Sequence, residues 1–196
     1  MITSKIKNIE FKNPILVASG TYGYGNEVKD IANVEALGGI VTKSVTLKPR
    51  EGNKPPRIFE TASGMLNSIG LANVGVKEFC NNKIPYLNQL NTNIIVNIAG
   101  SSIDEYLETL DILESSDGNH IGYEINISCP NVKEGGMEFG VNPKITEKLT
   151  KKMRQKTNKL LIMKLSPNVT NISDIAIASE EGGADAVSAI NTLVGM

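Results

Sequence analysis

Residues 93–129, NIIVNIAGSSIDEYLETLDILESSDGNHIGYEINISC, decide the fold. The segments NIIVNIAG (93–100) and IGYEINISC (121–129) are short and mostly apolar, as buried strands are. Between them, SIDEYLETLDILESS (102–116) starts with a serine suited to cap a helix and carries apolar residues at helical spacing. A strand, a helix and a strand in this order predict two parallel strands joined by a helical crossover.

The same alternation extends along the whole 196-residue chain. Further strands are predicted at 13–20, 39–44, 160–167 and 184–192, and further helices at 26–39, 75–90, 143–157 and 171–183. An irregular segment that contains proline and glycine occupies about 47–73. Six such strands predict the α/β class with a mostly parallel sheet, for which a TIM barrel and an open doubly wound sheet both fit. Because no linker or repeat interrupts the pattern, we expect one domain over 1–196.

The composition of the chain argues against several classes of protein. The chain has 20 basic and 21 acidic side chains, so charge gives no reason to expect a nucleic-acid partner. The N-terminus lacks the apolar segment of a signal peptide, and no apolar run is long enough to span a membrane. Two cysteines, Cys80 and Cys129, form neither a disulfide framework nor a metal-ligand cluster. We therefore expect a cytoplasmic protein without a metal site.

Polar side chains stand where the predicted strands end. In a parallel α/β protein these ends share one face, and in barrels that face carries the active site. Any one such residue is more readily a turn or cap residue, but together they favour a site. Asparagine amides can bind a flat polar ring without adding charge, and lysines suit a substrate carboxylate or an electron-rich reduced cofactor. The residues are Ser19, Gly20, Lys43, Ser44, Asn97, Asn126, Ser128, Cys129, Lys164, Asn191 and Thr192.

Cys129 is a candidate nucleophile or proton acceptor. An acyl-transfer site would need a histidine, and the single histidine, His120, precedes the strand that Cys129 follows. The two residues are separated by about 30 Å of extended chain, which excludes a Cys-His site, and we expect His120 on the surface. Pro130 favours an extended exit from the strand. The glycine-rich stretch 131–140 suits a mobile flap over a pocket, or else a plain long loop.

These segments resemble one known family, the dihydroorotate dehydrogenases, and in particular their soluble class 1B branch. The resemblance covers the whole chain in order and favours class 1B through KEGGMEFG (133–140) after the cysteine. The matching segments are ASGTYGYG (18–25), TKSVTLKPREGNKPPRIFE (42–60), LNSIGLAN (66–73), VNIAG (96–100), NISCPNVKEGGMEFG (126–140), KLSPN (164–168) and AINTLVGM (189–196).

The resemblance implies a (β/α)₈ TIM barrel that holds FMN at the C-terminal ends of its strands and oxidises dihydroorotate to orotate in pyrimidine synthesis. It implies that Cys129 is the base that removes the C5 proton, while the C6 hydride passes to N5 of FMN. The implied substrate-binding residues are Lys43, Asn67, Ser68, Ile69, Gly70, Leu71, Asn126, Asn191 and Thr192. The implied FMN-binding residues are Ser19, Lys43, Ser44, Asn97, Asn126, Lys164 and Ile190.

The resemblance also implies a dimer of catalytic subunits and a partner subunit that carries FAD and an iron-sulfur cluster and passes electrons to NAD. A full barrel has eight strands, whereas six are predicted here, so we expect a truncated chain that is poorly stable alone and binds FMN weakly. Three other readings stay open: a non-catalytic remnant, a Schiff-base aldolase that uses Lys164, and a related flavin-dependent pyrimidine reductase.

Overall fold

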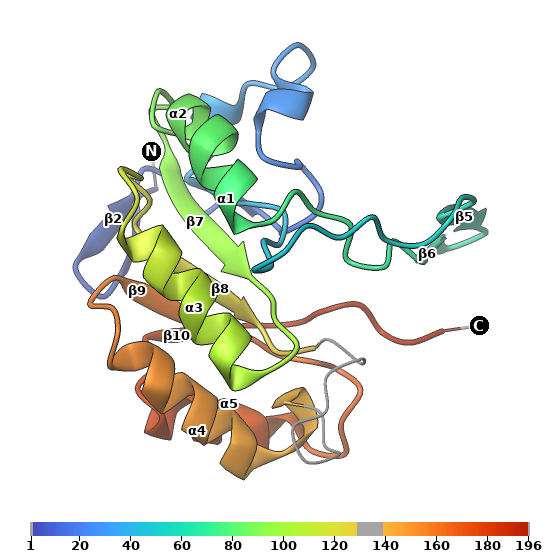
Figure 1. The fold of residues 1–196 in the computed structure, drawn as a ribbon. Coiled ribbons are helices and arrows are strands. Elements are labelled where there is room, and N and C mark those ends of the chain that lie inside the picture. The colour runs from blue at the N-terminus through green and yellow to red at the C-terminus, as the bar shows by residue number, and fades with distance from the viewer. Residues whose placement is uncertain (1, 129–138, 196) are drawn as a thin grey trace.

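A curled, six-stranded parallel sheet forms the centre of the computed structural model, which describes residues 2–128 and 139–195 (Figure 1). All five neighbouring pairs of strands in it are parallel. From one edge to the other the strands are β10 (Ala186–Ser188), β9 (Leu160–Lys164), β8 (Gly122–Asn126), β7 (Asn93–Ile98), β4 (Gly39–Val41) and β3 (Leu16–Val17). The curled sheet is a half-barrel, which confirms the prediction of an incomplete TIM barrel over an open doubly wound sheet.

Helices cover the outer face of this sheet (Figure 1). They are α1 (Val76–Glu78), a π-helical turn (Phe79–Lys83), α2 (Ile84–Leu87), α3 (Ile103–Glu114), α4 (Pro143–Arg154) and α5 (Ile172–Glu181). The three long helices begin at predicted positions because a side chain caps each one: Ser102, Asn142 and Asn171 accept hydrogen bonds from backbone N–H groups of the first turn.

Strand residues alternate between two cores. The outward-facing Ile94, Val96 and Ile98 of β7 belong to the main core, together with the buried side chains of α3. The inward-facing Ile95 belongs to a smaller core inside the half-barrel, with Val41, Leu160 and Ile162. Phe11 also lies in that smaller core and comes from a hairpin of β1 (Ser4–Ile6) and β2 (Ile9–Phe11). This apolar packing supports the polar residues that follow on the same strands.

Three predicted boundaries differ from the structure. Residues 26–39 do not form one helix but two short 3₁₀ turns, Asn26–Val28 and Val34–Ala36, because Asn33 leaves the helical backbone conformation between them. The first and last predicted strands shrink to β3 and β10. Within 47–73, which we expected to be irregular, β5 (Ile58–Thr61) and β6 (Gly64–Asn67) form an antiparallel hairpin.

The hairpin of β5 and β6 projects from the main body of the molecule (Figure 1). All eight of its strand residues are exposed, including Phe59 and Met65. A two-stranded ribbon without a packed face gains little stability from burial. No helix within the described ranges, 2–128 and 139–195, is long and apolar enough to cross a membrane.

Candidate active site

A polar layer lies above the apolar interior of the half-barrel. Two residues after Ile95, Ile162 and Ala186 along their strands come Asn97, Lys164 and Ser188. Because strand side chains repeat every second residue, each polar residue shares the inner face with the apolar residue before it. The strand register places Asn97 opposite Glu124, and it places Lys164 opposite both Ser188 and Asn126, two residues further along the strands. The C-terminal ends of the strands therefore bring their polar side chains together, as predicted.

Glu124 of β8 is the centre of this layer, and it was not among the predicted site residues. Its Oε1 accepts a hydrogen bond from Nδ2 of Asn97 at 2.6 Å, and its Oε2 accepts one from Oγ of Ser188 at 2.8 Å. The ammonium of Lys164 lies 3.6 Å from Oε1. Asn97 in turn accepts a hydrogen bond from Oγ of Ser44 at 2.5 Å. The network therefore joins three predicted FMN-binding residues, Ser44, Asn97 and Lys164, through one carboxylate.

A second contact joins two of the predicted substrate-binding amides. Nδ2 of Asn191 donates a hydrogen bond to Oδ1 of Asn126 at 2.9 Å, which links the exits of β10 and β8. Oδ1 of Asn126 also accepts a hydrogen bond from the backbone N–H of Ser128 at 3.2 Å. Thr192 lies beside them and donates its backbone N–H to Oδ1 of Asn191. The structure thus groups Asn126, Asn191 and Thr192 at the strand exits, and their role in substrate binding stays a prediction.

Lys43 and Ser19 follow β4 and β3. Lys43 is half-buried, and its backbone N–H donates to the carbonyl of Gly23. Within the described part of the chain, no ion pair or hydrogen bond involves its ammonium group. Ser19 is half-buried two residues after β3. Lys43 therefore supplies a cationic group that the described protein does not neutralise.

The predicted stretch Asn67–Leu71 lies apart from these groups. Asn67 ends β6, opposite Ile58 in the projecting hairpin, and Ser68 returns to its base through a backbone hydrogen bond to Arg57. Among the described residues, no hydrogen bond connects 67–71 with Asn126 or Asn191. Ile190, the remaining predicted contact, is about half exposed beside Asn191. The placement of 67–71 against the site stays a prediction.

Cys129 and most of the glycine-rich stretch 131–140, up to residue 138, lie outside the described residues, so the structure does not test their predicted roles. The first described range ends at Ser128, whose buried hydroxyl has no hydrogen-bond partner among the described residues. A buried hydroxyl of this kind is a group that a ligand can satisfy.

Comparison with known proteins settles the family. Residues 1–196 match the family model described as "Dihydroorotate dehydrogenase". The chain belongs to the dihydroorotate dehydrogenase family. It is 49% identical over 195 residues to a protein of Bacteroides thetaiotaomicron, and 48% identical over 192 residues to one of Thermodesulfovibrio yellowstonii. Both relatives are named "Dihydroorotate dehydrogenase B (NAD(+)), catalytic subunit". The alignments cover 100% and 98% of this chain but 64% and 63% of the relatives.

The chain thus spans about 64% of the length of these dihydroorotate dehydrogenases. The whole-chain match confirms the family and the class 1B resemblance that the sequence motifs suggested. It also agrees with six strands out of the eight of a complete barrel.

The prediction that His120 lies on the surface is wrong. His120 is buried, with 4% of its surface exposed. It lies at the N-terminal end of β8, where its Nε2 contacts the hydroxyl of Tyr123 at 2.8 Å and the ammonium of Lys159 at 3.2 Å. Burial, followed by the charge of Lys159, lowers the pKa of His120 to about 4. A sequence pattern could not show this burial, because the covering groups come from α3 and from the segment before β9. The dehydrogenase prediction does not use His120.

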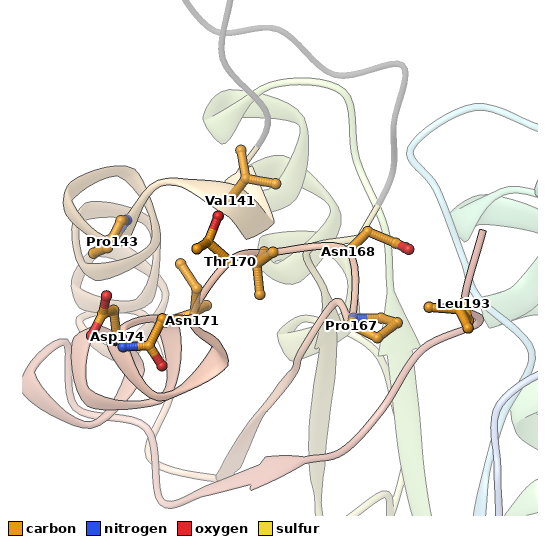
Figure 2. A pocket seen from close by; sticks show the side chains of 10 residues that line it. Val141, Pro143, Pro167, Asn168, Thr170, Asn171, Asp174 and Leu193 are labelled. Carbon is orange, nitrogen blue, oxygen red and sulfur yellow. Dashed lines mark hydrogen bonds between the residues drawn. The ribbon is translucent and has the colours of Figure 1, made fainter.

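A surface hollow of about 690 Å³ lies near the start of α4 and the connection from β9 to α5 (Figure 2). Asn168, on its edge, bonds the carbonyl of Thr192 and the N–H of Val194, which ties the chain after β10 to this connection. Asp174, its one acidic lining residue, is bonded to Asn171. The predicted site residues of the dehydrogenase do not line this hollow, so it is not the candidate active site.

Proposed function

We propose that this chain is the catalytic part of an FMN-dependent enzyme that oxidises (S)-dihydroorotate to orotate in the de novo synthesis of UMP. The observation that carries the proposal is the family match over residues 1–196, with relatives named as dihydroorotate dehydrogenase B catalytic subunits. The polar layer at the strand exits supports it, because its lysines, amides and hydroxyls are suited to a flat, polar ring.

The donor set fits a flavin. Ser44, Asn97 and Lys164 would hold the ring from within the half-barrel, with Ser19, Asn126 and the backbone of Ile190 at its margin. When bound, FMN supplies the hydride acceptor for the reaction. Lys43, whose ammonium has no described partner, would lie between the flavin and the substrate and attract the substrate carboxylate. Asn126, Asn191 and Thr192, with the stretch from Asn67 to Leu71, would orient the dihydropyrimidine ring.

The reaction breaks two C–H bonds of the substrate, one at C5 and one at C6. Cys129, as thiolate, would take the proton from C5, and bound FMN would supply the acceptor for the hydride from C6, so that a C5–C6 double bond would form. A free thiol has a pKa near 8.5, so a small fraction is ionised at neutral pH. Turnover limited by this step should therefore rise between about pH 7 and 9.

A partner subunit follows from the name of the relatives, "catalytic subunit". The proposal places FAD and an iron-sulfur cluster on that partner, which passes electrons to NAD, and pairs two catalytic chains. It also places the enzyme in the cytoplasm, in agreement with the free thiol of Cys80.

The aldolase reading is disfavoured by the surroundings of Lys164. A Schiff-base lysine must have an amine that is free to attack a carbonyl carbon, whereas the amine of Lys164 lies 3.6 Å from the carboxylate of Glu124 in an ion pair. Borohydride trapping with a carbonyl substrate should therefore leave Lys164 unmodified.

The test is anaerobic bleaching of the bound flavin. The purified protein with FMN should lose its visible flavin absorbance when dihydroorotate is added, which a flavin-dependent pyrimidine reductase or a non-catalytic remnant would not show. Cys129→Ala should still bind FMN but should not bleach. Cys80→Ala is the matched control and should bleach like the unmodified protein. Bleaching of Cys129→Ala at the unmodified rate would refute the role of Cys129 as base.

A further inference from the structure

Glu124 is a buried carboxylate for which the resemblance supplies no role. It comes from the middle of an apolar parallel strand and is 4% exposed. A carboxylate in such a position is costly unless its charge and both its oxygens are satisfied. Asn97 and Ser188 donate to its two oxygens, and Lys164 balances its charge. Four strands or strand exits, those of β4, β7, β9 and β10, thus meet at Glu124 directly or through Asn97.

The hydrogen bonds around Glu124 have a fixed direction. A carboxylate can only accept, so Asn97 must turn its NH₂ group towards Glu124. The carbonyl oxygen of Asn97 then faces Ser44, whose hydroxyl must donate to it. Since a serine hydroxyl has a single proton, Oγ of Ser44 can serve any further partner only as an acceptor. The charge at Glu124 therefore determines, through Asn97, whether Ser44 acts as a donor or as an acceptor towards a further partner.

The backbone of Asn97 is fixed as well. Its N–H donates to Oγ1 of Thr42 at 3.2 Å, and its carbonyl accepts from the N–H of Val45 at 2.9 Å. The backbone of Asn97 is therefore held on both sides. What can still change is which atom of its side-chain amide, Oδ1 or Nδ2, faces Glu124. Only the acceptor at position 124 selects between the two orientations.

The same carboxylate restrains Lys164. The Lys164 side chain is 12% exposed and its ammonium has Glu124 as its ion-pair partner among the described residues. A long lysine side chain has many rotamers, and an ion pair in a buried setting removes most of them. Glu124 thus fixes the position of Lys164, which is a donor, and the orientation of the hydroxyl of Ser44, which is left as an acceptor.

We propose that Glu124 is a positioning residue of the flavin site: it acts through Asn97 and Lys164, orients Ser44 as an acceptor, and presents Lys164 as a fixed cationic donor. The inference rests on the proposed function, because it takes Ser44 and Lys164 as flavin-binding groups. It adds that the hydrogen-bond pattern offered to the ring is set by a residue that does not touch the ring.

The test compares Glu124→Gln with Glu108→Gln, an exposed glutamate on α3, by titration with FMN. The new amide at position 124 can donate to Asn97, which lets that amide reverse, and it no longer holds Lys164. The FMN dissociation constant of Glu124→Gln should rise at least about tenfold, as expected for loss of a charge-assisted interaction, and its visible flavin maxima should shift. Glu108→Gln should bind FMN as the unmodified protein does.

A double variant separates positioning from mere structural damage. Glu124→Gln combined with Asn97→Asp exchanges the amide and the carboxylate, so that the position-97 side chain again accepts from Ser44. Its flavin maxima should return towards those of the unmodified protein, which a loss of folding could not produce. The double variant also tests the positioning role of Glu124 if Glu124→Gln alone does not fold. Unchanged affinity and spectrum in Glu124→Gln, or no spectral recovery in the double variant, overturns the inference.

A measurement on the cofactor-free protein distinguishes this inference from the proposed function. If the unmodified protein binds no FMN, the proposed function fails. The orientation of Asn97 is then read by NMR: its side-chain NH₂ protons should exchange slowly with solvent in the unmodified protein and much faster in Glu124→Gln. Equal exchange in both proteins would show that Glu124 does not fix Asn97.

Discussion

Tyr123 and Glu124 are neighbours on β8, yet they belong to two polar clusters of opposite character. Glu124 points into the half-barrel and joins Asn97, Ser188 and Lys164 at the strand exits. Tyr123 points outwards and donates to Oε1 of Glu114 at 2.6 Å. We call the first group, together with Lys43, Ser44, Asn126 and Asn191 at the strand exits, the inner cluster. The outer cluster is defined as His120, Tyr123, Glu114, Thr157 and Lys159.

Most hydrogen bonds of the outer cluster join its own members, and among the described residues Nδ1 of His120 has no partner. Glu114 accepts from the hydroxyls of Tyr123 and Thr157, and Lys159 lies 3.7 Å from it. Although burial acts in the opposite direction, these donors and the nearby positive charge lower the pKa of Glu114. Burial, then the bond to Glu114, raises the pKa of Tyr123. In the inner cluster, by contrast, the ammonium of Lys43 has no partner among the described residues and Oγ of Ser44 can still accept a hydrogen bond, as the proposed flavin site requires.

The largest expected effect comes from Lys164→Met in the inner cluster. It removes one partner of a buried pair and leaves Glu124 charged and uncompensated, which costs about 3–5 kcal/mol of unfolding free energy. Urea unfolding measures the loss. Lys159→Met in the outer cluster is the matched control and should cost about 1 kcal/mol or less, because both members of its pair are partly exposed.

Adding Glu124→Gln to Lys164→Met should recover much of the lost stability, since the orphaned charge is then gone. If Lys164→Met is as stable as Lys159→Met, the two clusters do not differ in the way their burial suggests.

Acid should weaken the outer cluster first. The folded pKa of His120 is lowered from 6.5 to about 4, so the unfolded chain binds a proton at a higher pH than the folded chain does. The contribution of neutral His120 is therefore complete above pH 6.5 and is lost as the pH falls towards 4. At about 1.4 kcal/mol for each pH unit, the loss amounts to about 3 kcal/mol.

Urea unfolding between pH 4.5 and 7.5 tests this, with His120→Gln as the comparison. The variant should show a much flatter pH dependence in this window. The lowered pKa of Glu114 acts at lower pH, because its contribution is lost below the unfolded value of 4.5. An equally steep pH dependence in His120→Gln would assign the effect to another group.

The inner cluster was largely predictable, because it follows from the order of the strands. Once the chain alternates strand and helix, parallel strands must carry their exits to one face, and Asn97, Asn126, Lys164 and Asn191 stand at those exits. Glu124 was also within reach of the sequence: a single carboxylate in the apolar run YEINI (123–127) is a signal for a paired buried charge.

The outer cluster was not predictable, because its burial is made by distant segments. Glu114 ends α3, and Thr157 and Lys159 precede β9, so nothing local to His120 shows that it is covered. The hairpin of β5 and β6 was missed for a related reason: its strands are short and exposed on both faces, so they carry no apolar periodicity. The predicted helix at 26–39 shows the opposite error, a periodic pattern interrupted by the backbone at Asn33.

A smaller effect than that of Lys164→Met or of His120 protonation is expected for Tyr123→Phe, which removes one hydroxyl from the outer cluster and leaves its aromatic packing. Glu114 loses its hydrogen bond from Tyr123 but keeps the one from Thr157 and its ion pair with Lys159. The cost should therefore be about 2 kcal/mol, the value for a hydrogen bond to a charged group. The hydroxyl of Tyr123 also contacts Nε2 of His120. Its loss should therefore change the pH dependence below 6.5, whereas FMN binding at the inner cluster should not change. Thermal unfolding and FMN titration of the same variant measure both results. A change in FMN affinity would mean that the two faces of β8 are coupled, and that the outer cluster is part of the site after all.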